Sequence, residues 1–148
     1  MRKTKLFFLL SLLSQIINAQ DVKVTSGKVI RFSNFKSQFI DARNIDIWLP
    51  DNYSNNEKYA VLYMHDGNML YDAESTWNKQ AWEVDEVAGK LISEGKTQKF
   101  IVIGIWNNGA KRHPEYFPQK PYESLSQIQK DTVTARLKKS GKNTEIFK

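Results

Sequence analysis

Three adjacent residues, His65, Asp66 and Gly67, could carry chemistry because they follow directly on an apolar stretch, residues 61–64. A histidine beside a carboxylate can bind a metal ion or form a catalytic dyad, and an Asp-Gly pair can form a tight turn. Each of these possibilities makes a different demand on the rest of the sequence.

A metal site would need ligands that the sequence does not bring together. Adjacent side chains on an extended strand point to opposite faces, so His65 and Asp66 cannot easily share one ion. The other histidine is His113, and the sequence has no cysteine and no His-x-x-x-His spacing. We therefore predict no protein-built zinc site and no cofactor.

A catalytic serine would need a sharp turn, typically Gly-x-Ser-x-Gly after a strand, because small flanking residues permit the strained backbone. Among the seven glycines, no two stand four apart with a serine between them. The sequence therefore contains no nucleophile elbow.

A turn at Asp66-Gly67 is the remaining possibility. Gly67 can take backbone angles closed to other residues, and the turn can present the next backbone N–H toward a cleft. In an acyl-transfer enzyme such a donor stabilises the negative oxygen of the tetrahedral intermediate. From spacing alone, a purely structural Asp-Gly turn is the stronger interpretation.

The elements that would position this turn follow an α/β pattern. Residues 27–35 and 39–50 have strand-like patterning and indicate an antiparallel pair at a sheet edge. Residues 59–64 form a nearly continuous apolar run, typical of a strand covered on both faces. Residues 100–106 form a second such strand, and the sequence between 59–64 and 100–106 contains a helix.

The helix is predicted from apolar residues spaced as one face of an amphipathic helix, with Gly95 placed to end it. These are Val84, Val87, Ala88, Leu91 and Ile92. Strand, helix and strand make a βαβ unit behind the antiparallel lead-in strands, so the predicted fold class is α/β. Residues 107–122 indicate a long ordered loop at the carboxyl end of the second buried strand, and residues 123–139 a weak helix.

Three segments, residues 45–53, 59–72 and 101–118, resemble in order and interval the first half of the putative esterase family of α/β-hydrolases. That family includes enterochelin esterases, feruloyl and acetyl-xylan-type carbohydrate esterases, and mycolyltransferases of the antigen 85 type. The resemblance covers about residues 40–122. An Arg-x-x-Glu-Tyr-x-Pro element beginning at Arg112 adds to its specificity.

The resemblance implies that the backbone N–H of Asn68, after the turn at Gly67, is the strand-side oxyanion donor. His65 and Asp66 would then shape the turn. In the family the catalytic serine, acid and histidine come later in the chain, and none of them matches a position here. Residues 20–148 are therefore expected to be the N-terminal portion of an esterase domain, with an incomplete α/β-hydrolase sheet.

The expected active-site rim comprises Trp106, Asn107, Arg112 and Tyr116. Aromatic rings with an arginine suit sugar or aromatic-acid esters, through stacking and hydrogen bonding. Arg112 could equally pair with Glu115 and only hold the loop in place.

Two further groups of residues have a structural interpretation. Trp77 and Trp82 are expected to pack in the core or against the helix. Glu83, Asp85 and Glu86 are expected to form an exposed acidic face of the helix.

Residues 1–19 have the layout of a signal peptide: Arg2, Lys3 and Lys5, an apolar run, then Ala19. The unbroken run, residues 6–13, is far shorter than the roughly 18 residues that span a bilayer, which favours export over anchoring. Cleavage would lower the formal net charge from +6 to +3. The basic residues are interspersed with acids, so no nucleic-acid partner and no stable membrane anchor are expected.

These observations favour an exported, periplasmic or extracellular serine-type carboxylic ester hydrolase that acts on carbohydrate- or siderophore-linked esters. Its nucleophile would lie outside these 148 residues, so this chain alone would be inactive. One alternative is a non-catalytic carbohydrate-binding module on the same scaffold. Another is a truncated fragment without a function of its own.

Overall fold

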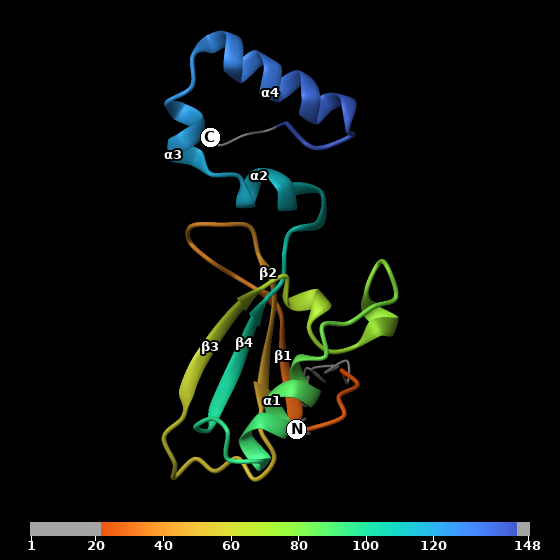
Figure 1. Cartoon of the computed structure of the whole chain (residues 1–148), viewed down its shortest axis with the longest axis vertical. Helices are drawn as coiled ribbons and strands as arrows, with labels where there is room; N and C mark the ends of the chain where they lie inside the picture. Colours follow the sequence, from red (N-terminus) through yellow and green to blue (C-terminus); the bar gives the residue numbers. More distant parts are fainter. Residues whose placement is uncertain (1–21, 145–148) are drawn as a thin grey trace, which may run out of the picture.

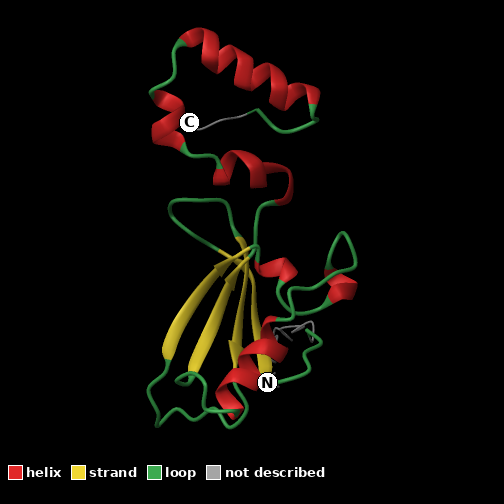
Figure 2. Ribbon diagram, in the orientation of Figure 1, coloured by secondary structure: helices red, strands yellow, loops and turns green. Residues whose placement is uncertain are grey.

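Four strands form one mixed sheet in the computed structural model, which describes residues 22–144 (Figures 1 and 2). The strands are β1 (Lys28–Phe35), β2 (Arg43–Leu49), β3 (Ala60–His65) and β4 (Phe100–Ile105). The strand order is β1-β2-β4-β3, with β2 antiparallel to both of its neighbours and β3 parallel to β4. The antiparallel lead-in and the βαβ unit are therefore confirmed, and the fold class is α/β. The predicted signal peptide lies outside the described residues.

The helix α1 (Val84–Ser93) covers one face of this sheet. A core of buried side chains lies between them and includes Trp48 from β2, Ala88 from α1 and Val102 from β4. Gly95, with φ of +66°, follows the helix and confirms the predicted end. The alternation of apolar and polar residues in β2 thus places Trp48 toward the helix and Ile47 toward the opposite face.

The acidic residues of α1 do not form the exposed face that the sequence predicts. Asp85 is completely buried, and its Oδ2 accepts hydrogen bonds from the backbone N–H groups of Thr25 (2.7 Å) and Ser26 (3.4 Å). Burial, which disfavours the charged form, raises the pKa of Asp85. Asp85 therefore fastens the segment that leads into β1 to the first turn of α1.

The expectation that residues 59–64 are covered on both faces is wrong. The strand β3 lies at an edge of the sheet, and Val61, Leu62 and Tyr63 are exposed. An apolar run indicates that a strand can be buried, but not which elements are present to bury it. The lead-in strand predicted at 39–50 also begins later, at Arg43.

The residues after β4 form short helices, where the sequence predicted a long loop. They are η3 (Gly109–Lys111), α2 (Arg112–Tyr116) and α3 (Gln119–Glu123). The predicted weak helix is confirmed as α4 (Gln127–Lys139), which begins with a capping box between Ser126 and Gln129. In Figure 1 these helices lie beyond the end of the sheet, so they cover neither face. Within residues 22–144, no helix has the length and apolar character that crossing a membrane requires.

The tryptophans Trp77 and Trp82 are not packed as the sequence predicts. Trp77 is 85% exposed and Trp82 is 49% exposed. Both belong to the connection between β3 and α1, which also contains the single turns η1 (Gly67–Met69) and η2 (Ala73–Ser75).

Candidate functional site

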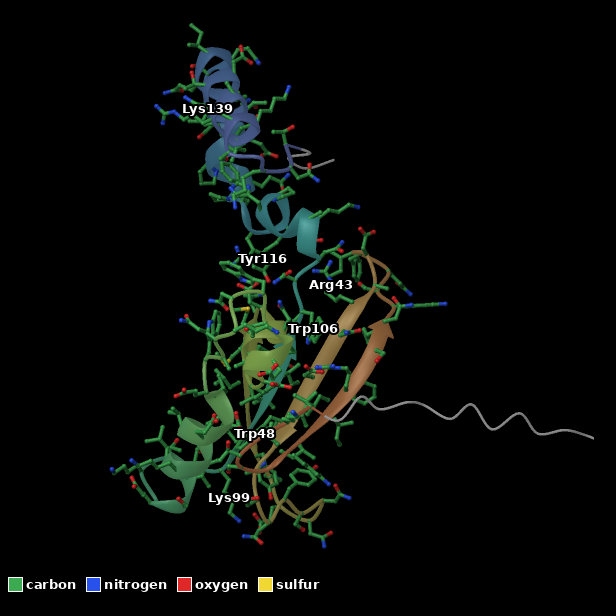
Figure 3. The ribbon with its side chains drawn as sticks, turned by 90° about the vertical axis from the view of Figure 1, so that its right-hand side faces the viewer. Arg43, Trp48, Lys99, Trp106, Tyr116 and Lys139 are labelled. Atoms are coloured by element: carbon green, nitrogen blue, oxygen red, sulfur yellow. The ribbon has the colours of Figure 1, made fainter. Side chains whose placement is uncertain are left out.

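The residues singled out from the sequence meet at one end of the sheet, where β3 and β4 finish and β2 begins. Because β3 and β4 are parallel, the chain segments that follow them, η1 and the loop to α2, emerge side by side. Figure 3 shows Arg43, Trp106 and Tyr116 at this end, with Trp48 and Lys99 toward the other.

Asp66 and Gly67 make different contributions to the turn after β3. Asp66 takes the left-handed conformation, with φ of 54°, so the unusual backbone angles lie at Asp66 and not at Gly67 as predicted. Gly67 is needed for space: an added Cβ would lie 2.6 Å from the carbonyl carbon of Gly104 and 2.9 Å from Trp106 Cδ1. Glycine therefore allows η1 to approach β4 closely.

The carboxylate of Asp66 is the centre of the site. It is buried, and Arg112 donates to both of its oxygens, with Nε–Oδ1 2.8 Å and Nη2–Oδ2 2.5 Å. Asn107 donates a further hydrogen bond to Oδ1 at 2.8 Å. The hydrogen bond from Arg112 lowers the pKa of Asp66 and outweighs the opposing effect of burial. Asp66 is thus an ionised acceptor that organises its neighbours.

Asn107 links the two chain segments that leave the sheet here. Its amide nitrogen also donates to Asn68 Oδ1 (2.9 Å), and its amide oxygen accepts from the N–H of Gly109 (2.9 Å). Both amide hydrogens and the carbonyl are therefore used. The side chain of Asn107 ties η1, which contains Asn68, to the loop after β4.

Asn68 offers a backbone donor at this position. It lies in the first turn of η1, where N–H groups have no acceptor within the helix. Among residues 22–144, its N–H makes no hydrogen bond, while the residue itself is half-buried. An unused backbone N–H on a turn that side-chain hydrogen bonds hold in place can stabilise a negative oxygen that approaches it.

Arg112 and Tyr116, both on α2, form the exposed part of the site. The guanidinium of Arg112 lies 5.0 Å from the centre of the Tyr116 ring, and the Tyr116 hydroxyl accepts from the N–H of Asp66 at 3.3 Å. The ring of His65 lies against the same tyrosine, with ring centres 5.2 Å apart. His65 therefore packs beside the site and does not form a dyad with Asp66.

The alternative pairing of Arg112 with Glu115 is wrong, because Glu115 binds Arg43 instead. Arg43 donates to both carboxylate oxygens, at 2.8 and 2.9 Å. This pairing lowers the pKa of Glu115 and raises that of Arg43. The helix α2 is thus held to the sheet by two bidentate ion pairs, one to the turn after β3 and one to the start of β2.

The side chain of Trp106 makes its contacts with other residues of the protein. Its indole N–H donates to Asp46 Oδ2 at 2.8 Å, and the guanidinium of Arg31 lies 4.6 Å from its ring centre. Arg31 also binds Asp46 through two hydrogen bonds of 2.7 and 2.8 Å. Of the four predicted rim residues, Asn107, Arg112 and Tyr116 therefore gather around Asp66, while Trp106 joins a separate buried network.

Sequence reasoning missed Arg43 and Asp46 as parts of this end of the sheet. Arg43 is 72 positions from its partner, and no local spacing pattern relates the two. No group of three or more His, Cys, Asp or Glu side chains in the described range lies close enough together to hold a metal ion.

Comparison with known families gives a match to this chain. The family model described as "Putative esterase" matches residues 37–137. This match spans more than half of the chain, which therefore belongs to the putative esterase family. The family predicted from the segments around Asp66 and Arg112 is confirmed.

Proposed function

We propose that this chain is the N-terminal part of an exported serine-type carboxylic ester hydrolase. Its contribution to catalysis would be the backbone N–H of Asn68, which acts as an oxyanion donor. Arg112 and Tyr116 would border the substrate. Family membership supports the ester-hydrolase class, and the apolar leader at residues 1–19 supports export.

The observation that carries this proposal is the set of hydrogen bonds that holds Asn68 and its turn in place. The Asp66 carboxylate is held by Arg112 and Asn107, and Asn107 also holds the Asn68 side chain. An oxyanion donor must keep its position while charge develops on the substrate, because reorganisation during the reaction would cost energy. A turn fixed by the ion pair between the buried Asp66 carboxylate and Arg112, and by the shared amide of Asn107, meets that requirement.

The reaction would follow the acyl-enzyme route. A serine hydroxyl from residues beyond Lys148 would attack the ester carbonyl while a histidine takes its proton. The carbonyl electron pair would move to the oxygen, where the Asn68 N–H stabilises the charge. Collapse would expel the alkoxide, which takes the proton from the histidine and leaves as the alcohol, and the acyl-serine remains. Water then hydrolyses the acyl-serine to the carboxylic acid and frees the serine.

The alternative of a binding module without catalysis receives less support. It relied on Trp106 as a stacking ring, and the indole N–H of Trp106 is bonded to the buried Asp46. Arg112 and Tyr116 are exposed, but both also serve the Asp66 network.

The first test is to read the coding DNA after the Lys148 codon. We expect an open frame that continues into Gly-x-Ser-x-Gly and later an acid and a histidine. A stop codon in undamaged sequence would contradict the proposal. The 148-residue chain alone should not hydrolyse p-nitrophenyl acetate above a heat-killed control.

The second test addresses Asn68 in the complete reading frame. Asn68→Pro removes the N–H, and proline suits the φ of a 3-10 helix, while the preceding Gly67 has no Cβ to clash with the ring. We expect kcat for p-nitrophenyl acetate to fall about 100-fold. Asn68→Ala keeps the N–H but loses the hydrogen bond from Asn107 to Asn68 Oδ1, so its kcat should fall less than about tenfold. Equal losses of kcat in the two variants would show that the Asn68 N–H is not the oxyanion donor.

A further inference from the structure

The segment that leads into β1, residues 22–27, lies directly on α1 and is called the strap below. Its apolar side chains, Val22 and Val24, pack against the core that α1 and the sheet enclose. An added Cβ at Gly89 of α1 would collide with Ser26 Oγ, so glycine is what allows the strap to cross the helix closely. Undocking of the strap would therefore uncover apolar side chains of the core.

Two consecutive acids of α1, Asp85 and Glu86, hold the strap by the same residue. The N–H of Thr25 donates to Asp85 Oδ2 at 2.7 Å, and the Thr25 hydroxyl donates to Glu86 Oε1 at 3.0 Å. Side chains of consecutive helical residues leave the helix in directions about 100° apart. Because both carboxyl groups bind Thr25, they nevertheless lie close together as a pair.

Each carboxyl group of this pair has one oxygen that receives no hydrogen bond from the described part of the chain. Asp85 is completely buried, and its Oδ1 has no partner there. Glu86 Oε2 is also buried and lacks a partner among residues 22–144. Within the same range, neither acid forms an ion pair with a lysine or an arginine. Two buried negative charges without donors or cations are strongly disfavoured.

One proton held between the two carboxyl groups removes both problems, because the protonated group then donates to the ionised one. Burial, and after it the hydrogen bond to Glu86, raises the pKa of Asp85. Burial also acts to raise the pKa of Glu86, but its hydrogen bonds, chiefly that from Asp85, outweigh this effect and lower it. Asp85 is thus the member of the pair that keeps the proton.

The other ionisable groups around Asp85 leave this balance unchanged. Tyr71, on the connection between β3 and α1, is buried, and burial and the charges of Asp46 and Asp85 raise its pKa, so it stays neutral. The carboxylate of Asp46, on β2, is bound by Arg31. Lys23, the ionisable side chain of the strap, is exposed and forms no ion pair within the described residues.

We propose that Asp85 and Glu86 share one proton, and that this proton makes the docking of the strap on α1 sensitive to pH. When Asp85 loses the proton, a second negative charge is left in a buried position beside the first. Undocking lets water reach both carboxylates, so the docked strap becomes less stable relative to the undocked one.

The direction of the pH dependence follows from the two shifts. The pKa of Asp85 is raised from 3.8, so its contribution to docking is full below about pH 3.8 and is lost as the pH rises through the folded pKa. The pKa of Glu86 is lowered from 4.5, so its contribution has the opposite sign and is complete above about pH 4.5. Docking is therefore strongest in acidic solution and weakens as the pH rises from there.

The test begins with a carbon-13 NMR titration of the two side-chain carboxyl groups in the 148-residue chain. We expect Asp85 to ionise after Glu86, with a midpoint above its ordinary value of 3.8. Protection of the Thr25 and Ser26 amides from hydrogen exchange, corrected for the intrinsic rate, is measured in the same samples. It should fall about tenfold per pH unit between about pH 4.5 and the Asp85 midpoint, as the linkage to one proton requires.

Two variants show whether this pair is responsible. Asp85→Asn keeps the acceptor for Thr25, and its amide can donate to Glu86, but it cannot ionise. Strap protection in that variant should change less than about threefold over the same pH range. Glu83→Gln is the matched control, because Glu83 is an exposed acid at the start of the same helix. That variant should keep the wild-type Asp85 midpoint and the wild-type dependence of protection on pH.

Several results would overturn the proposal. An Asp85 midpoint at or below 3.8 would do so in the wild-type chain itself, so this readout does not depend on the folding of a variant. Strap protection that does not vary with pH, or that varies equally in Asp85→Asn and the wild-type chain, would also overturn it. An equal loss of the pH dependence in Glu83→Gln would show that the pair is not its source. The pair contains no residue of the candidate site, so failure here leaves the esterase proposal standing, and the reverse holds too.

Discussion

The carboxylate of Asp66 binds two side chains that stand 41 and 46 positions further along the chain, Asn107 and Arg112. Both were singled out from the sequence, since they follow a buried strand in a segment with the family's pattern. Which acid Arg112 would meet could not be predicted, because Glu115 lies at helical spacing and Asp66 does not. The pairing depends on Arg43: Arg43 binds Glu115, and Arg112 therefore pairs with Asp66.

Because of the Asp66–Arg112 ion pair, we expect the stability of the folded chain to depend on pH in the acid range. The pKa of Asp66 is lowered from its ordinary value of 3.8, chiefly by the hydrogen bond from Arg112. The folded state therefore binds its proton less tightly than the unfolded state. The stabilisation is complete above about pH 3.8 and is lost as the pH falls through the lower, folded pKa.

The Arg112 Nε–H signal in a nitrogen-15 NMR spectrum reports on this pair directly. We expect it to stay protected from solvent exchange between neutral pH and about pH 4, and to lose protection below that range. In Asp66→Asn the protection should be low at every pH, because the charge-assisted bond is gone. Loss of protection already near pH 6, or equal protection in Asp66→Asn and the wild-type chain at neutral pH, would contradict the assigned pairing.

At the scale of the elements, periodicity predicted β2, β3, α1 and β4 to within a few residues, but it did not predict α2. Helix α2 is five residues long, and it lies in a segment, residues 107–122, whose Asn, Gly, Pro and aromatic residues are typical of a loop. Long-range ion pairs hold it in place where local propensity is weak. Tertiary contacts of this kind leave no periodic signal in a sequence.

The pair Arg43–Glu115 should therefore decide whether α2 stays docked. The Arg43 side chain is 8% exposed, so replacing it by methionine leaves Glu115 without its partner in a partly buried position. We expect amide hydrogen exchange across residues 112–117 to accelerate about tenfold or more in Arg43→Met, as for a loss of roughly 1.4 kcal/mol.

Lys111→Met is the matched control for that substitution. Lys111, in η3 just before α2, pairs with Asp41, just before β2, but both side chains are about half exposed. Exposed ion pairs contribute little, so exchange across residues 112–117 should change less than about threefold. Equal acceleration in the two variants would show that α2 is not held by the buried pair.

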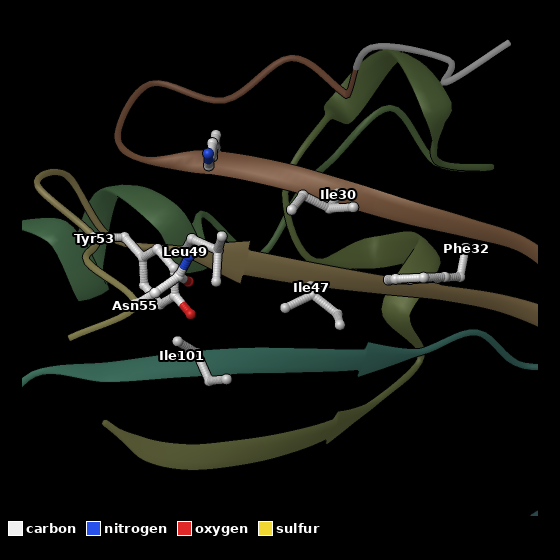
Figure 4. A pocket seen from close by; sticks show the side chains of 8 residues that line it. Ile30, Phe32, Ile47, Leu49, Tyr53, Asn55 and Ile101 are labelled. Atoms are coloured by element: carbon white, nitrogen blue, oxygen red, sulfur yellow. The ribbon is translucent and has the colours of Figure 1, made fainter. Parts of the chain in front are cut away.

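At the scale of the whole molecule, the sheet has one covered face and one open face. Alternation and strand register place ten apolar side chains on the open face, opposite α1. Part of it forms a shallow hollow of about 550 Å³, seen in Figure 4, where Ile30, Ile47 and Ile101 point to the same side. The ten residues are Ile30, Phe32, Ile45, Ile47, Leu49, Val61, Tyr63, Ile101, Ile103 and Ile105.

The open face should bind apolar probes in the 148-residue chain. Exposed apolar patches of this kind favour association, so we expect strong enhancement of anilinonaphthalene sulfonate fluorescence. Ile30→Lys combined with Tyr63→Lys places a charge on each edge strand, where lysine is tolerated, and should at least halve the enhancement. Ile128→Lys, at a residue 79% exposed on α4, should leave it unchanged. If Ile128→Lys lowers the signal as much, or the wild-type chain gives none, the open face does not behave as an exposed apolar surface in solution.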